Sequence, residues 1–149
     1  YSDRAASMSA RVRDVSEYLV QLDFQPRGHV DATVTYDAPC HLIHAQRIAT
    51  APLDLLQRVP GVNLVPLARA DECCGGAGTY GITHPDIGGR IVEDKLDAVR
   101  MTGAQTVCTP NPGCIMQIGG GLILAGDDVD VRHPVELLAR SVRAATGAE

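Results

Sequence analysis

The sequence is poor in aromatic residues: it has no tryptophan, one phenylalanine and four tyrosines in 149 positions. Few side chains are therefore available to stack on bases, and the net charge of −5 shows no basic excess. Both features argue against nucleic-acid binding. Long apolar runs are also missing. The longest, residues 115–125, is interrupted by three glycines at 119–121, so no transmembrane segment is expected.

The cysteines do not form the pattern of a secreted disulfide framework. There are five, an odd number, and two of them, Cys73 and Cys74, are adjacent and cannot easily bridge each other. No CxxC pair occurs, although such pairs are typical of structural zinc sites. A reducing cytoplasm, where thiols are kept for metal or redox chemistry, fits this usage.

What the sequence does contain is the composition of one ordinary globular domain, with 21% charged and 45% hydrophobic residues. An N-terminal helix and linker over residues 1–28 precede a domain over residues 29–149, in which strand-like and helix-like runs alternate. This alternation predicts an α/β fold: a mostly parallel four-stranded sheet with helices on both faces, as in Rossmann-like domains. The expected strands are residues 33–36, 62–67, 106–109 and 129–132. The expected helices are residues 10–22, 39–58 (divided by Pro52), 85–100, 112–124 and 134–145.

Two of these helices have a clear apolar stripe in the sequence. The first, over residues 10–22, and the third, over residues 85–100, have apolar residues at helical spacing, and Gly103 follows the third helix as a C-terminal cap. The stripe of the first helix is Val12, Val15, Leu19 and Leu22. The stripe of the third is Ile87, Ile91, Leu96 and Val99.

Four cysteines follow the ends of three predicted strands. Cys40 comes after the first strand, Cys73 and Cys74 after the second, and Cys114 in the first turn of the helix after the third. Because the carboxyl ends of parallel strands meet at one edge of a sheet, three distant connections bring four thiols to the same place. We therefore expect Cys40, Cys73, Cys74 and Cys114 to bind one metal centre.

The residues around these cysteines suit thiolate ligands. Asn111 and Pro112 are typical of a helix N-cap and first position, which places Cys114 where the helix dipole lowers the pKa of a thiol. The glycines next to the cysteines leave room for a bulky ligand and offer backbone N–H groups to it. The predicted cofactor-binding residues are Gly75, Gly76, Gly78, Asn111 and Gly113.

Other polar residues have simpler interpretations. Cys108 lies inside the third predicted strand and is interpreted as a core residue, with a ligand role as the alternative. His41 and His44 follow Cys40 and are assigned to support of the site, with ligation as the alternative. Residues 76–81 match G-x-G-x-x-G, but the motif follows no strand directly and opens no helix, so we reject a nicotinamide site.

In these motifs the sequence resembles the CCG, or cysteine-rich, domain family, and most closely the C-terminal module of the glycolate oxidase iron–sulfur subunit. Four segments in order carry the resemblance, which extends over residues 30–145. They are residues 37–42 (DAPCHL), 73–78 (CCGGAG), 111–114 (NPGC) and 133–138 (HPVELL). In heterodisulfide reductase the third segment is CxxC, whereas Asn111 replaces its first cysteine here. The resemblance therefore implies a four-thiolate [4Fe–4S] cluster on Cys40, Cys73, Cys74 and Cys114, with zinc as a substitute metal.

The resemblance also implies a role for the chain. It is expected to be the C-terminal part of a longer protein with ferredoxin-like and first CCG modules, in an electron-transfer module of glycolate or another 2-hydroxy-acid dehydrogenase. Electrons would come from a flavin-containing subunit and leave to a quinone or another acceptor, in the cytoplasm or at the inner membrane through partners. Two alternatives remain open: a catalytic module that reduces a disulfide, as in heterodisulfide reductase, and a structural zinc domain.

Overall fold

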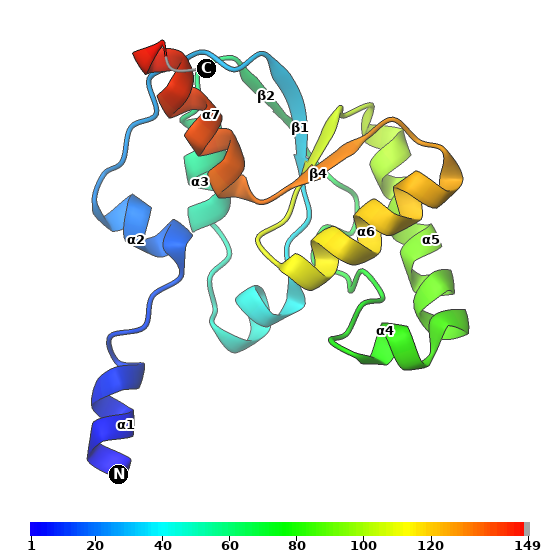
Figure 1. Cartoon of the computed structure of the whole chain (residues 1–149), viewed down its shortest axis with the longest axis horizontal. Helices are drawn as coiled ribbons and strands as arrows, with labels where there is room; N and C mark the ends of the chain where they lie inside the picture. The colour runs from blue at the N-terminus through cyan, green and yellow to red at the C-terminus, as the bar shows by residue number, and fades with distance from the viewer. Residues whose placement is uncertain (148–149) are drawn as a thin grey trace.

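The computed structural model describes residues 1–147, so the last two residues of the predicted 29–149 domain lie outside it. Its centre is a four-stranded, wholly parallel sheet in the order β2-β1-β3-β4. The strands are β1 (Ala32–Tyr36), β2 (Val62–Val65), β3 (Thr106–Cys108) and β4 (Asp130–Arg132). The predicted fold class is therefore confirmed (Figure 1).

Helices cover both faces of this sheet (Figure 1). On one face lie α2 (Val15–Gln21), α3 (Ala51–Gln57) and α7 (Pro134–Thr146), and on the other lie α5 (Pro85–Thr102) and α6 (Pro112–Ala125). Each face has its own apolar core, because neighbouring strand residues point to opposite sides. In β3, Cys108 belongs to the core beneath α3 and α7, whereas Val107 belongs to the core beneath α5 and α6.

The N-terminal prediction of one helix over residues 10–22 is wrong. The chain instead forms α1 (Ser2–Ser9), leaves helical conformation, and starts again at α2. The cause is a capping box at Asp14. Its carboxylate accepts from Ser16 N at 2.8 Å, and Glu17 Oε2 accepts from Asp14 N at 3.3 Å. A capping box provides hydrogen-bond partners for the free N–H groups at the start of a helix. It therefore favours a helix start after Asp14, although the apolar spacing continues through this position.

The predicted break at Pro52 is also misplaced. After β1 the chain makes a π-helical turn, η1 (His41–Ala45), and the interruption falls before α3 at residues 46–50. Arg47 lies there in the left-handed region, at φ 61°. Pro52 is in the first turn of α3, where the missing N–H costs no hydrogen bond, so this proline helps to start a helix.

Helix α5 buries only the C-terminal half of its predicted apolar stripe. Leu96 and Val99 are buried as expected, but Ile87 and Ile91 are 41% and 39% exposed. At this end of the helix Gly88 makes the contact instead: a Cβ there would lie 3.0 Å from Gly75 O. The loop after β2 that contains Gly75, Gly76 and Gly78, here called the glycine loop, therefore packs closely against Gly88 of α5. A short helix, α4 (Tyr80–Thr83), joins this loop to α5.

Within residues 1–147, no helix combines the length and the apolar character that crossing a bilayer requires.

Candidate metal centre

The three cysteine-bearing connections follow the strands as predicted. Cys40 precedes η1 after β1, Cys73 and Cys74 lie in the connection from β2 to α4, and Cys114 is in the first turn of α6 after β3. All three connections leave the carboxyl ends of adjacent parallel strands.

Cys74 and Cys114 form the centre of the site. Their Sγ atoms are 3.2 Å apart, and the two residues are only 4% and 8% exposed. The hydrogen bond between the two sulfur atoms lowers the pKa of the Cys74 thiol to about 7, although burial opposes the shift. The same hydrogen bond, with burial, raises the pKa of Cys114, so the lowered pKa expected from its place in the first turn of α6 is wrong. The hydrogen bond therefore favours loss of a proton from Cys74 over loss from Cys114.

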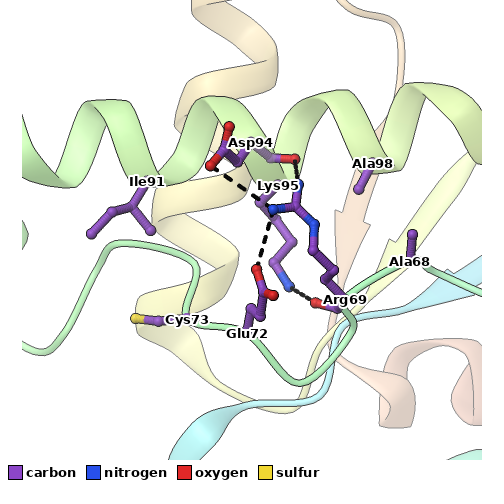
Figure 2. Close-up of a pocket in the computed structure, with 8 residues that line it drawn as sticks. All are labelled: Ala68, Arg69, Glu72, Cys73, Ile91, Asp94, Lys95 and Ala98. Atoms are coloured by element: carbon purple, nitrogen blue, oxygen red, sulfur yellow. Dashed lines mark hydrogen bonds and ion pairs between the residues drawn. The ribbon is translucent and has the colours of Figure 1, made fainter.

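The other two predicted ligands lie at the surface. Cys40 and Cys73 are both exposed, and Cys73 Sγ accepts from Gly75 N at 3.3 Å. In Figure 2 the Cys73 sulfur points away from Arg69 and Glu72. Within residues 1–147, no group of three or more His, Cys, Asp and Glu side chains is placed to hold a metal ion. The structure thus brings together two of the four predicted thiols, and the four-ligand set stays a prediction.

The glycines of the loop have different surroundings. Gly75 has a φ of 86°, and a Cβ there would lie 2.4 Å from Gly88 O, so only glycine fits against α5. A Cβ on Gly76 would lie 3.5 Å from Cys74 Sγ, so this glycine borders the thiol pair. Gly78 opens to free space, with no described atom within 4 Å of such a Cβ, and Gly113 borders Asn111 Oδ1 at 3.0 Å. Of the predicted cofactor-binding glycines, Gly76 therefore borders the thiol pair and Gly75 positions the loop, and their role in binding a cofactor stays a prediction.

Asn111 caps α6 as the sequence predicted, and it makes a second bond that the sequence did not reveal. Its Oδ1 accepts from Cys114 N at 3.1 Å. Its Nδ2 lies 2.9 Å from His41 Nδ1, and because an amide nitrogen only donates, the imidazole nitrogen accepts. His41 therefore supports the site through Asn111, and Asn111 links the start of α6 to η1.

Replacing Asn111 with alanine removes both bonds and is expected to cost about 1 kcal/mol of unfolding free energy, the usual value of an N-cap. Asn111→Asp is the matched control, because a carboxylate still accepts from Cys114 N but does not donate to His41 Nδ1. Urea unfolding of both variants separates the cap from the link to His41. Equal stability of Asn111→Ala and the unmodified protein would show that neither bond stabilises the fold.

Behind the thiol pair lies a buried ion pair that sequence reasoning missed. Lys95 Nζ is 2.9 Å from Asp37 Oδ1, and both residues are at most 4% exposed. Asp37 directly follows β1, and its Oδ2 accepts from Thr109 Oγ1 at 3.0 Å after β3. Burial raises the pKa of Asp37, and the Lys95 ammonium opposes that shift. One feature of the sequence could have indicated this ion pair: the single lysine of the chain, Lys95, directly precedes Leu96 of the apolar stripe of α5.

Lys95 also holds the chain that leads to the cysteines. Its Nζ donates to Arg69 O at 2.8 Å, and Ala70 O is 3.4 Å away. Figure 2 shows this ammonium reaching from α5 past Glu72 to the Arg69 backbone. These residues line a pocket of about 230 Å³. The Arg69 side chain lies beside Glu72, at 3.4 Å, and Asp94, at 3.9 Å. The segment before Cys73 is therefore fixed to α5 by charged groups.

Cys108 is separate from the site. It is fully buried on the opposite face of the sheet, which confirms its interpretation as a core residue, and burial raises the pKa of its thiol to about 12. At about pH 8 we therefore expect iodoacetamide to label exposed Cys40 and Cys73 in the folded, metal-free protein and to label Cys108 only after unfolding. Peptide mass spectrometry measures this order. Labelling of Cys108 as fast as Cys73 would contradict the burial.

The comparison with protein families agrees with this arrangement. Residues 34–119, which contain the last three residues of β1, all of β2 and β3 and all the cysteines, match the family model described as the cysteine-rich domain, CCG. This chain belongs to the cysteine-rich domain family. The match covers more than half of the sequence and includes Asn111.

Similar proteins extend the comparison beyond this domain. The chain is 33% identical over 144 residues to lactate utilization protein A of Exiguobacterium sp., covering 95% of this chain and 59% of that protein. It is 34% identical over 143 residues to a probable glycolate oxidase iron-sulfur subunit of Bacillus subtilis, covering 93% of this chain and 32% of that protein. The chain therefore spans about three fifths of the first relative and about a third of the second.

Proposed function

We propose that this chain holds an iron–sulfur cluster and passes electrons within a 2-hydroxy-acid oxidase or dehydrogenase complex. The observation that carries the proposal is the buried contact between Cys74 and Cys114, which joins the glycine loop to the start of α6. The names of the relatives, which refer to lactate utilization and to an iron-sulfur subunit of glycolate oxidase, support this chemistry. Glycolate or lactate would be oxidised on a flavin-containing partner.

The donor set suits such a cluster. Thiolates bind iron–sulfur clusters, and the hydrogen bond with Cys114 lowers the pKa of the Cys74 thiol, which favours that form. Cys73 is next to this pair in the chain, and Cys40 is on the adjoining connection, so both are the remaining proposed ligands of a [4Fe–4S] centre. When bound, the cluster supplies one-electron transfer. The residues of the chain hold it, exclude water at Cys74 and Cys114, and offer backbone N–H groups beside Gly76.

The proposed setting follows the relatives. The longer parent protein would add ferredoxin-like and first CCG modules to this domain, since the relatives extend well beyond the matched part. Electrons would pass from the flavin subunit through this domain to a quinone or another acceptor. The proposed location is the cytoplasm, with peripheral attachment to the inner membrane through partner proteins.

The test is iron and acid-labile sulfide analysis of the 149-residue protein purified without oxygen. We expect brown protein with iron and sulfide in equal amounts, and we expect Cys74→Ser to lose both, because serine oxygen is a poor cluster ligand. Cys108→Ser is the matched control and keeps the cluster, since Cys108 lies on the other face of the sheet. Folded, colourless protein without iron would overturn the proposal.

A zinc site is the second candidate, and one distance favours it. Two thiolates on a tetrahedral zinc ion are about 3.8 Å apart, given Zn–S bonds of about 2.3 Å. The sulfur atoms of Cys74 and Cys114, 3.2 Å apart, lie within about 0.6 Å of that spacing, so the same pair also suits zinc. About one zinc per chain and no iron in anaerobically purified protein would support a structural zinc domain.

A further inference from the structure

A second reaction is open to the same two thiols, and it concerns the domain when no metal is bound. Cys74 and Cys114 lie 40 positions apart in the sequence, yet their sulfur atoms are 3.2 Å from each other. A disulfide bond is about 2.05 Å long, so the two sulfur atoms need to approach by only about 1.2 Å more to form one. This inference rests on the proposed function in one respect: the two thiols are also proposed ligands.

The surroundings leave these two thiols as the natural pair. Cys73 is adjacent to Cys74, and neighbouring cysteines bridge only with strain. Cys108 lies on the opposite face of the sheet, fully buried. Cys40 lies at the surface before η1. Cys114 therefore has one thiol in contact, and that thiol belongs to Cys74.

We propose that hydroperoxides oxidise Cys74 and Cys114 of the metal-free domain to an intramolecular disulfide, which closes the site to metal until a dithiol reduces it. The Cys74 thiol releases its proton, and its sulfur attacks one peroxide oxygen; the O–O bond breaks, Cys74 becomes a sulfenic acid, and the departing hydroxide takes up the released proton to give the first water. The Cys114 sulfur then attacks the Cys74 sulfur, and the sulfenic hydroxyl leaves with the proton of the Cys114 thiol as the second water. Two thiols lose two electrons, and one hydrogen peroxide is reduced to two waters.

The bridge would act on the site in two ways. It removes two thiolates, and a disulfide sulfur does not serve as a thiolate ligand. It also joins the loop that contains Gly75 to the first turn of α6 by a covalent bond, so the loop cannot open for a metal. Because a disulfide stops further oxidation at sulfur, both residues are kept from the irreversible sulfinic and sulfonic acids.

The experiment uses the 149-residue protein, freed of metal by a chelator without oxygen and then treated with one equivalent of hydrogen peroxide. Remaining thiols are blocked with iodoacetamide in denaturant, and peptides are mapped without reduction. We expect two of the five thiols to disappear and a cross-linked peptide pair containing Cys74 and Cys114. We also expect uptake of iron and sulfide to fall at least tenfold and to return after dithiothreitol.

Two variants assign the bridge, because Cys73 shares a peptide with Cys74. Cys73→Ser should keep the cross-link, and Cys114→Ser should lose it without forming another. A bridge that persists in Cys114→Ser, a bridge that disappears in Cys73→Ser, or oxidation to sulfinic acid without any bridge would each overturn the inference. The two proposals fail separately. Reduced protein that never binds iron contradicts the cluster alone, and iron-binding protein that forms no bridge contradicts the disulfide alone.

Discussion

Replacing Lys95 with methionine is expected to lower the free energy of unfolding by about 3–5 kcal/mol, because it leaves the Asp37 carboxylate buried without a positive partner. The ion pair is 2.9 Å long, and both residues are almost fully buried. The variant also loses the bond from Lys95 Nζ to Arg69 O, so the segment before Cys73 is released from α5. Urea unfolding monitored by circular dichroism measures the loss.

The double variant Asp37→Asn with Lys95→Met separates charge from packing. An uncharged pair no longer carries the desolvation cost of two ions, so the double variant should be clearly more stable than Lys95→Met alone. A double variant that is as unstable as Lys95→Met would show that the lysine acts through its backbone contacts at Arg69 and not through Asp37.

Gly75→Ala is expected to disrupt the loop that contains the cysteine pair, at a cost of about 2–5 kcal/mol. The left-handed conformation at φ 86° accounts for roughly 1–2 kcal/mol of this, and a Cβ 2.4 Å from Gly88 O adds overpacking of about 1–3 kcal/mol. Because Cys74 is next to Gly75 in the chain, relief of that contact should disturb the position of Cys74 against Cys114, and iron binding should fall together with stability. Thermal unfolding and iron analysis report the two effects.

Two other glycines serve as controls. Gly78 also has a positive φ, 64°, but among the described residues no atom lies within 4 Å of an added Cβ. Gly78→Ala should therefore cost only the backbone part, about 1–2 kcal/mol. Gly89 lies inside α5 with similar free space, so Gly89→Ala should stabilise the helix by roughly 0.5–1 kcal/mol. Equal effects of Gly75→Ala and Gly78→Ala would contradict the role given to the contact with Gly88.

Local signals explain which parts of the fold were predictable. Asn111 and Pro112 start α6 through contacts within one turn, and Gly103 ends α5 in the left-handed conformation, so neighbours in the sequence determine both boundaries. The strands also follow short apolar runs. The single helix expected over residues 10–22 is wrong because the apolar periodicity of Val12 and Val15 continues across the capping box of Asp14. Apolar periodicity alone does not detect a helix cap.

The site was predictable in its position but not in its details. Parallel strands oblige their following connections to meet at one edge, and this brings Cys74 and Cys114 into contact, whereas Cys40 and Cys73 lie exposed. Whether Cys73 or Cys74 turns inward depends on the conformation of Gly75 and on its contact with Gly88. The pairing of Lys95 with Asp37 joins residues 58 positions apart, and only the assembled fold brings them together.

The two hydrogen bonds of Asn111 affect how many cysteine sulfur atoms this edge of the sheet provides as possible metal ligands. A cysteine at position 111 would supply a further donor beside Cys114. The same change would leave the Cys114 amide without its strong acceptor and would free the imidazole of His41. A larger set of sulfur ligands would therefore come with a weaker connection between the segments that follow β1 and β3. The two hydrogen bonds of the Asn111 amide keep that connection strong.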